Sequence, residues 1–283
     1  MKRVVIMGAS SGIGLAVAEA LASRGVKTGL AARHTKELHA LKEKYPACVE
    51  YESIDVTHND GPKKLEELID KLGGMDIYFH VAGIGYSNPS LDPHREAEMI
   101  ATNAGGFARM ISAAYGYYRD NSRKGQIVAL TSVAGTNGIG DMAAYSASKK
   151  CAQTYLVALE QLARKKKVDI TFTDIRPGWI RTPLLDVDKS YPMEMTLDYV
   201  VPMIIRAIVK HPRVVYIDAR WAALCSAWKA IPDAVWAKMN VSPAKKISLG
   251  NEDSAMVEVS VEAEKPIEPE VSVDIDTASP SDN

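Results

Sequence analysis

The sequence of 283 residues predicts an α/β fold in which helices cover both faces of a doubly wound parallel sheet. Two observations indicate it: short apolar runs alternate with longer helical patterns, and a glycine-rich turn joins the first run to the first helical pattern. The apolar runs, each expected to form a strand, lie at about residues 3–7, 27–32, 49–54, 76–81, 126–131, 169–174 and 213–217. The helical patterns lie between them at about residues 11–24, 35–45, 60–72, 95–118, 142–166 and 196–211.

The first strand and helix carry a pattern typical of a dinucleotide phosphate site. Residues 3–7 are apolar, as in a buried parallel strand, and the alanine-rich segment 15–24 favours a helix. Between them, Gly8 allows a tight turn, Gly12 lets the backbone approach a pyrophosphate, and Gly14 lets the helix pack closely on the strand. The start of the helix adds free amide donors and the positive end of the helix dipole. A glycine-rich turn without a ligand is the alternative.

The end of the second strand favours NADP(H) over NAD(H). An NAD site usually has Asp or Glu about 20 residues beyond the glycines, but the acid is missing here and Arg33 is present. A guanidinium can form charge-assisted bonds to a 2′-phosphate and stack on adenine. Ser10 and Ser11 in the glycine turn could add hydroxyl donors. The alternative is that Arg33 is an ordinary solvated loop residue.

The fifth strand and the helix after it carry side chains suited to acid–base chemistry. Tyr145 and Lys149 are four residues apart, which places the phenol and the ammonium on the same helix face. A nearby cation favours the phenolate and lowers the pKa of a phenol from about 10, so Tyr145 could exchange a proton near pH 7. Ser132 follows the strand at its carboxyl end, where ligands bind in open α/β sheets, and could hydrogen-bond an oxygen that gains charge.

Together these residues resemble the short-chain dehydrogenase/reductase family over roughly residues 1–220. The family motif Thr-Gly-x-x-x-Gly-x-Gly is present, with Met7 in place of the threonine. The resemblance implies a Rossmann-type single domain and NADP(H)-dependent interconversion of a carbonyl and an alcohol. It implies that Ser132 polarises the carbonyl, that Tyr145 is the general acid/base, and that Lys149 lowers the tyrosine pKa and binds the nicotinamide ribose. Asn103 would hold a water that links Lys149 to solvent.

The resemblance also implies a set of cofactor-binding residues. Asp55 matches the acidic residue that caps the adenine pocket, and Pro177, Gly178 and Thr182 match the turn that holds the nicotinamide. With the residues of the glycine turn and Arg33 argued above, the expected cofactor-binding residues are Gly8, Ser10, Ser11, Gly12, Ile13, Gly14, Arg33, Asp55, Val56, Ala82, Gly83, Tyr145, Lys149, Pro177, Gly178, Ile180 and Thr182.

One stretch departs from the family pattern. The Asn-Asn-Ala-Gly that follows the fourth strand in the family is His80-Val81-Ala82-Gly83 here. Ala82 and Gly83 keep the close approach to the cofactor, whereas His80 and Val81 lose two side-chain amides that mostly brace neighbouring backbone. We therefore expect altered local stability and intact chemistry. A second acid/base role for His80 is the alternative, although a lone histidine on a buried strand is more often a packed, hydrogen-bonded residue.

Composition narrows the partners and the compartment. A net charge of −1 gives no general attraction to nucleic acid. Cys48, Cys151 and Cys225 are scattered without metal-type spacing, which argues against disulfides and fits a reducing cytoplasm; we expect Cys151 to be a buried helix residue. The apolar run before Gly8 is too short for a signal peptide. We expect no metal site, a small hydrophobic carbonyl or alcohol as substrate, and a homodimer or homotetramer.

The C-terminal third contains three less regular segments. Residues 184–195 match the substrate lid of the family, with an ordinary surface loop as the alternative. Residues 219–241 carry tryptophans at near-helical spacing, and we take the amphipathic extension as residues 221–250. Its apolar face could pack on the protein's own core, become buried in a dimer or lie on a membrane. Membrane attachment is the least expected of the three, because the segment has few cations. Residues 251–283 are acidic and contain prolines, which predicts a disordered tail.

Two other functions remain open from the sequence. One is a 3-oxoacyl-carrier-protein reductase, for which Arg119, Arg123 and Lys124 are candidates for a basic docking patch near the crevice. The other is a non-catalytic NADP-binding regulator or scaffold, which would have no need of Tyr145.

Overall fold

The computed structural model describes residues 2–183, 185, 189–241 and 245–246. A seven-stranded sheet has the order β3-β2-β1-β4-β5-β6-β8, and all its neighbouring strands are parallel. Its strands are β1 (Arg3–Met7), β2 (Lys27–Ala32), β3 (Val49–Ser53), β4 (Ile77–His80), β5 (Gly125–Leu130), β6 (Ile170–Pro177) and β8 (Val214–Ile217). This confirms the predicted doubly wound sheet. The strand order reverses between β1 and β4, and ligands bind beside such a reversal at the carboxyl ends of the strands.

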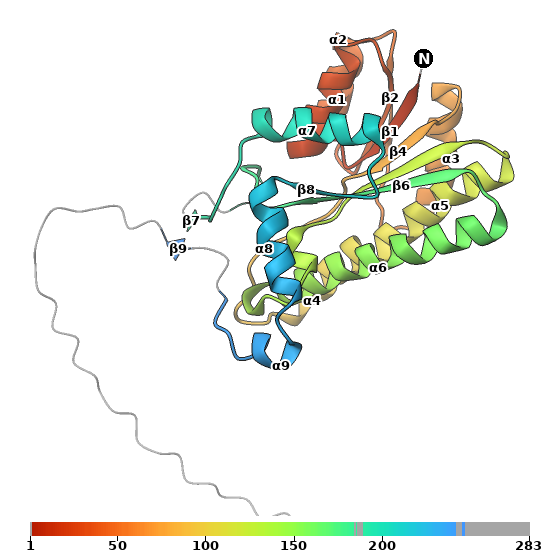
Figure 1. Cartoon of the computed structure of the whole chain (residues 1–283). Coiled ribbons are helices and arrows are strands. Elements are labelled where there is room, and N and C mark those ends of the chain that lie inside the picture. The colour runs from red at the N-terminus through yellow and green to blue at the C-terminus, as the bar shows by residue number, and fades with distance from the viewer. Residues whose placement is uncertain (1, 184, 186–188, 242–244, 247–283) are drawn as a thin grey trace, which may run out of the picture. The chain divides into compact units, whose positions relative to one another are not determined.

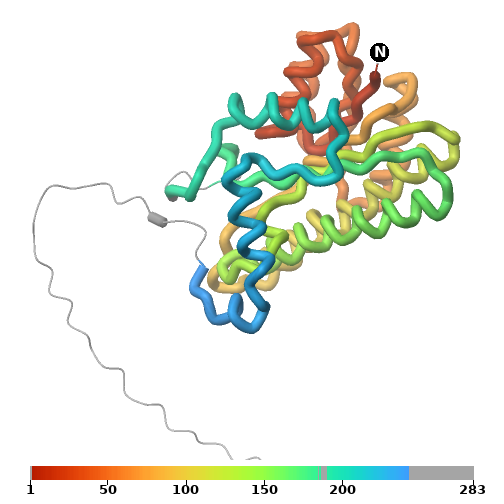
Figure 2. The backbone as a smooth tube through the Cα atoms, in the orientation of Figure 1, coloured from red at the N-terminus to blue at the C-terminus, as the bar shows by residue number. Residues whose placement is uncertain are grey.

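Helices cover both faces of the sheet (Figure 1, Figure 2). One face is covered by α1 (Gly12–Ala22), α2 (Lys36–Lys44) and α7 (Leu197–Lys210). The other is covered by α3 (Gly61–Leu72), α5 (Phe107–Asp120) and α6 (Ala143–Lys166), with α4 (Pro93–Ile100) packed on α6. These boundaries agree with the predicted ones to within a few residues, apart from the helix expected at 95–118.

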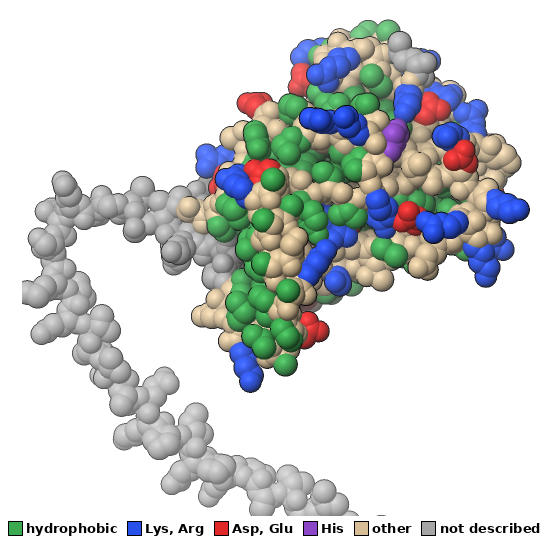
Figure 3. All heavy atoms as spheres, in the orientation of Figure 1, with side chains coloured by type: hydrophobic (Ala, Val, Ile, Leu, Met, Phe, Trp, Pro, Cys, Tyr) green, Lys and Arg blue, Asp and Glu red, His purple; other side chains and the backbone are tan. Residues whose placement is uncertain are grey.

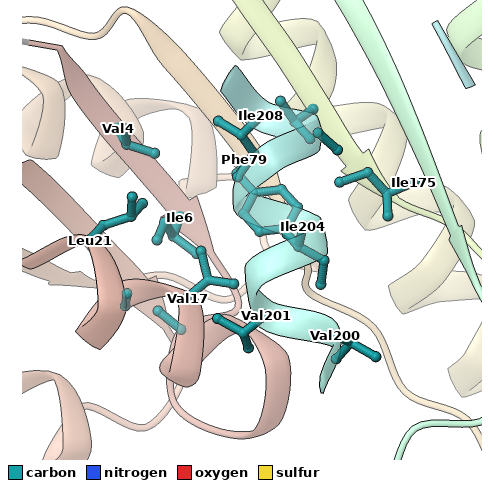
Figure 4. Packing of buried hydrophobic residues seen from close by; sticks show 14 of the residues in the cluster. Val4, Ile6, Val17, Leu21, Phe79, Ile175, Val200, Val201, Ile204 and Ile208 are labelled. Carbon is teal, nitrogen blue, oxygen red and sulfur yellow. The ribbon is translucent and has the colours of Figure 1, made fainter. Parts of the chain in front are cut away.

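The central strand β1 shows why both faces need helices. Val4 and Ile6 belong to the hydrophobic cluster under α1 and α7, whereas Val5 and Met7 belong to the cluster under α3 and α5. Successive side chains of a strand point to opposite faces, so a strand covered on both sides is apolar throughout. Figure 4 shows the first cluster, in which side chains from β1, β4, β6, α1 and α7 meet. Each fully buried aliphatic side chain contributes about 1.5 to 3 kcal/mol.

The helix expected at 95–118 is three segments in the structure. Between α4 and α5 lies a π-helical turn, η1 (Ala101–Gly106), and Asn103 lies inside it. The Asn103 amide donates to the carbonyl of Ile84 and accepts from the Ile84 amide, at 2.6 and 2.8 Å, which ties this turn to a loop 19 residues away. Gly106 lets the turn pack closely on Val56, because a Cβ at position 106 would lie only 2.6 Å from the Val56 side chain. Wide turns of this kind are often found at functional sites.

The tryptophan-rich segment packs on its own core, one of the three possibilities left by the sequence. It forms α8 (Ala219–Lys229) and α9 (Asp233–Trp236). Trp221 is 2% exposed, and the Trp236 indole donates to the Gly138 carbonyl at 2.6 Å. Figure 3 shows hydrophobic side chains gathered over α8 and α9 on the visible face, and Val235 and Met239 are about half exposed. The described residues between 2 and 246 belong to one compact unit, and whether the extension acts as a separate part stays a prediction.

The two short strands β7 (Lys189–Ser190) and β9 (Lys245–Lys246) pair antiparallel, so the chain after α9 returns to the expected lid segment. The predicted disordered tail, 251–283, lies outside the described residues. Within the described ranges, no helix is both long and apolar enough to cross a bilayer.

Cys151 is exposed on α6, so the expectation that it is buried was wrong; position 151 lies on the solvent side of the amphipathic helix.

Candidate active site

A cavity of about 690 Å³ opens along the carboxyl edge of the sheet. The ends of β1, β2, β5 and β6 contribute to its lining, together with the loops that follow these strands and the loop that follows β4. Every site residue expected from the sequence lines this cavity except Gly14 and Asn103. Segments that are far apart in the chain therefore meet at one place, because parallel strands all end at the same edge.

The glycine turn has the geometry expected of a phosphate cradle. Gly8 has a φ of 95°, and a Cβ there would lie 2.5 Å from the amide nitrogen of Ala82. Gly14 does not line the cavity, because it lies inside the turn, where a Cβ would collide with the carbonyl oxygen of Gly8. Ser11 is the N-cap residue of α1, and its side chain makes no capping hydrogen bond. The first amides of α1 thus face the cavity as donors suited to a pyrophosphate.

The second strand of the site ends in an exposed cation next to an ordered acid. Arg33 follows β2 and Asp55 follows β3, and both line the cavity. The Asp55 carboxylate accepts from the amide and the hydroxyl of Thr57, at 2.8 and 2.6 Å. Burial raises the pKa of Asp55, but these hydrogen bonds outweigh it and leave the pKa below its ordinary value. A carboxylate held by two hydrogen bonds therefore lies beside an exposed guanidinium at this end of the cavity lining.

The three groups expected to perform the chemistry lie together in the cavity lining. Ser132 follows β5, and Tyr145 and Lys149 lie in the first two turns of α6. The Lys149 ammonium lies 5.6 Å from the centre of the Tyr145 ring and donates to the carbonyl of Leu130 at 3.2 Å. Burial raises the pKa of Tyr145, and its hydrogen bond with Ser132 opposes this rise. A lowering of that pKa by Lys149 stays a prediction.

Asn103 supports this centre from behind. Besides its two bonds to Ile84, its amide lies 3.3 Å from the hydroxyl of Ser148, which itself donates to the carbonyl of Tyr145 at 2.8 Å. A Cβ at Gly83 would lie 3.1 Å from the Asn103 amide oxygen and 3.6 Å from the Lys149 ammonium. Asn103 is 3% exposed, so it acts on the cavity through these neighbours. The role of Ile84 could not be read from the sequence, because its backbone makes the contacts.

Comparison with known proteins gives the family. Residues 2–191 match the profile of the family described as short chain dehydrogenase. The chain belongs to the short-chain dehydrogenase family. A relative from Myxococcus xanthus, named an uncharacterized oxidoreductase, is 32% identical over 203 residues, which make up 70% of this chain and 79% of the relative.

Two solved structures illustrate the shared fold of this short-chain dehydrogenase. A short chain dehydrogenase from Burkholderia cenocepacia in complex with NADP has a TM-score of 0.71 and 21% identity, and the match covers 86% of this chain and all of that one. A 3-ketoacyl-(acyl-carrier-protein) reductase from Brucella melitensis complexed with NADH has a TM-score of 0.66 and 19% identity, covering 76% of this chain and 96% of that one. Likeness at this level concerns the fold alone.

The short-chain dehydrogenase has a buried polar network behind Ser132 that sequence analysis missed. Asp174 of β6 is fully buried; it pairs with Arg176 at 2.6 Å and accepts from the Thr131 hydroxyl at 2.5 Å. Gln153, one helical turn after Lys149, donates to the carbonyl of Ser132 at 2.8 Å. The network thereby holds the end of β5 against α6 and β6. The one available signal was an acid and a base two residues apart at the end of a predicted strand.

His80 is packed and hydrogen-bonded in this short-chain dehydrogenase, as expected for a lone histidine on a buried strand. Its Nδ1 lies 3.0 Å from the hydroxyl of Tyr78, and its ring meets that of Phe107 edge-on at 5.0 Å. Burial and the nearby charge of Lys149 lower the pKa of His80 to about 3, against a smaller opposing effect of the Ala82 backbone. His80 does not line the cavity, and it is neutral near pH 7.

Lys149 makes the stability of the short-chain dehydrogenase depend on pH. Burial lowers the pKa of Lys149 from 10.5 to about 8, while attraction to Asp174 opposes the change. Between these two values the unfolded chain binds a proton that the folded chain has released, so the free energy of unfolding rises with pH over this interval. We expect Lys149→Met to remove a rise of about 3 kcal/mol. Urea unfolding of both proteins without cofactor at pH 8, 9 and 10 measures it; equal pH dependence in the two would contradict the lowered pKa.

Proposed function

We propose that this protein is an NADP(H)-dependent oxidoreductase that interconverts a ketone or aldehyde and the corresponding alcohol. The observation that supports this most is the convergence of Ser132, Tyr145 and Lys149 on the cavity that also contains the glycine turn. A hydroxyl, a phenol and an ammonium beside a phosphate cradle are the groups that a carbonyl reduction needs. The family consists of oxidoreductases, in agreement with the name of the Myxococcus relative.

Each of the three groups has a distinct task in the direction of reduction. The Ser132 hydroxyl donates a hydrogen bond to the carbonyl oxygen of the substrate, and this bond strengthens as the oxygen gains charge. Tyr145 transfers its phenolic proton to that oxygen. Lys149, charged at neutral pH with a pKa of about 8, stabilises the phenolate that remains. NADPH, when bound, supplies the hydride that reduces the carbonyl carbon.

The cradle fits a dinucleotide, and Arg33 supports the phosphorylated form. The fold does not decide between the coenzymes, since the Burkholderia structure contains NADP and the Brucella structure NADH. Arg33 is exposed at the cavity edge and free to turn toward a 2′-phosphate, and no acid occupies its position. Asp55, the nearby acid, is held by Thr57.

We expect NADPH to bind at least about ten times more tightly than NADH, because one charge-assisted contact to a phosphate contributes about 1.5 to 3 kcal/mol. Arg33→Asp should narrow or reverse this preference. Fluorescence titration with both coenzymes measures it. Arg24→Asp is the matched control, because Arg24 is equally exposed but lies at the far end of α1, away from the cavity. Equal affinities in the unaltered protein would contradict the proposal.

The experiment that tests the activity is a panel of ketones and aldehydes with purified protein, in which NADPH oxidation is followed at 340 nm. Turnover with any member separates an enzyme from a regulator or scaffold that only binds NADP. No turnover across the panel, together with tight NADPH binding, would favour the regulator.

A 3-oxoacyl-carrier-protein reductase is less well supported. Arg119, Arg123 and Lys124 lie at the end of α5 and directly before β5, which is the amino edge of the sheet, so they are not near the crevice as expected. Arg119 pairs with Asp120 and Lys124 with Asp169.

In the described part of the chain, no group of three or more His, Cys, Asp or Glu side chains is placed to hold a metal ion.

We also propose a homo-oligomer in the cytoplasm, as expected from the sequence. Ile100, Val157 and Leu162 are apolar and about 40% exposed on α4 and α6, which is consistent with burial against a second copy. Light scattering after size-exclusion chromatography tests the oligomer, and a monomer at micromolar concentration would exclude it.

A further inference from the structure

The tryptophans of this chain are concentrated at and next to the cavity lining. The sequence contains four tryptophans, and three of them, Trp179, Trp221 and Trp228, line the cavity. The fourth, Trp236, packs behind the third, with ring centres 5.3 Å apart. Aromatic residues make up only 7% of the chain and include three phenylalanines, so this clustering is not a consequence of composition.

These four indoles divide into anchors and lining groups. Trp221 and Trp236 are 2% and 8% exposed: the first lies over Gly178, where a Cβ would collide with the indole, and the second donates to Gly138. They fix α8 and α9 to the rest of the cavity. Trp179 and Trp228 are only half-buried, although each packs against another ring. Their remaining exposed faces belong to the cavity lining.

Trp179 places one of these faces next to the reacting groups. It packs with Ile139 and Met142 in the small cluster that includes the ring of Tyr145. Its own ring lies 4.8 Å from that of Tyr191, tilted by 38°. A substrate whose carbonyl oxygen reaches Tyr145 therefore extends its carbon skeleton along Trp179.

Trp228 provides a second face on α8. Its ring meets Trp221 at 6.5 Å and Trp236 at 5.3 Å, both edge-on, and its carbonyl accepts from the Asn137 amide at 3.1 Å. The contacts with the Trp221 and Trp236 rings and the hydrogen bond from Asn137, in the loop before α6, hold the Trp228 indole in place. Aliphatic side chains would suffice to exclude water from a generally apolar substrate. Rigid, half-covered indoles add the stacking preference of one aromatic ring for another.

From this arrangement we infer that the natural substrate is a ketone or alcohol with a flat aromatic ring system attached close to the reacting carbon, and that Trp179 and Trp228 determine this specificity. The inference rests on the proposed function, because it assigns the reacting carbon to the side of Tyr145. Its test is a binding measurement, so that its outcome does not depend on turnover.

The experiment compares two ketones that share a carbon skeleton and differ in flatness, 2-acetylnaphthalene and 2-acetyldecahydronaphthalene. Each is titrated calorimetrically into the full-length protein saturated with NADP⁺, a combination that cannot react because both partners are oxidised. We expect the flat ketone to bind about three to ten times more tightly, which corresponds to one favourable aromatic pair. Equal binding, or tighter binding of the decalin, would overturn the inference.

Variants assign the preference to particular rings. Trp228→Leu and Trp179→Leu keep an apolar side chain but remove the flat face, so each is expected to reduce the preference for the flat ketone at least twofold. Trp228→Phe should retain most of it. Tyr45→Leu is the matched control: it removes a partly buried ring that does not line the cavity and packs on none of the tryptophans, so it should lower thermal stability with no change in the preference. A full preference in both leucine variants would overturn the assignment.

The result separates the two proposals. A flat-ring preference without NADPH oxidation on any carbonyl would retain the binding inference and remove the proposed activity. Turnover of ketones with no binding preference between the two compounds would support the proposed activity and overturn the binding inference.

Discussion

Tyr145→Phe is expected to abolish turnover while NADPH affinity stays nearly unchanged. The substitution removes the one hydroxyl proposed to exchange a proton with the substrate oxygen, and loss of a general acid costs about 10²- to 10⁴-fold in rate. It leaves the glycine turn, Arg33 and Asp55 intact. Steady-state rates on a substrate found in the carbonyl panel, with fluorescence titration of NADPH, measure both quantities.

Two further variants show whether the loss is specific to the phenol. Lys149→Ala should lower both turnover and cofactor affinity, since that ammonium lies over the tyrosine ring and is expected to bind the nicotinamide ribose. His80→Asn, which restores the residue of the family pattern, should leave turnover largely intact, because a pKa of about 3 leaves the imidazole neutral near pH 7, without the imidazolium proton that a general acid would donate. If the phenylalanine variant retained more than a few per cent of the rate, a different acid would have to act.

Asp174→Asn is expected to produce the largest loss of stability, about 3 to 5 kcal/mol, because it leaves the Arg176 guanidinium as an uncompensated charge in a dry interior. The side chains of Arg176 and Asp174 are 10% and 0% exposed, so water cannot replace the lost partner. Urea unfolding at pH 7 measures the loss. Asp169→Asn is the matched control: its carboxylate is 66% exposed and lies 3.7 Å from Lys124, and such surface pairs contribute less than about 1 kcal/mol.

A double variant distinguishes charge from shape. Replacing Asp174 and Arg176 together by leucine and methionine removes both charges and keeps the bulk, so most of the stability should return. Asp174→Asn should also lower the pKa of Lys149 further, since the carboxylate opposes the effect of burial on it. A single variant as stable as the wild type would mean that the Asp174–Arg176 pair makes no net contribution.

The sheet and the phosphate site could be predicted from the sequence because their signals are local. An apolar run, a glycine turn and a helix adjacent in the chain have one common way to fold, and the collisions at Gly8 and Gly14 explain why those positions are glycine. Tyr145 and Lys149 were placed together by the period of a single helix. Asp55 and Asn103, by contrast, were found only through resemblance to the family, since no spacing relates them to the other groups.

Tertiary structure alone decided the features that depend on contacts between distant segments. In the π-helical turn at 101–106, Asn103 bonds to Ile84, and a helical sequence pattern does not reveal a partner in another loop. Asp174 lies at the end of a predicted strand, and its bond from Thr131 and the bond from Gln153 to Ser132 join three separate elements. Such polar networks leave no periodic signal, because each partner comes from a different element.

The tryptophan segment was predicted in part from the sequence and decided in part by tertiary structure. Its near-helical spacing predicted an amphipathic helix, but the same apolar face could have met the core, a second copy or a membrane. The contacts that decide the matter, Asn137 with Trp228 and Gly138 with Trp236, join residues 91 and 98 positions apart. Spacing along the chain determines which side chains share a face, and only the packing of one element on another determines what that face meets.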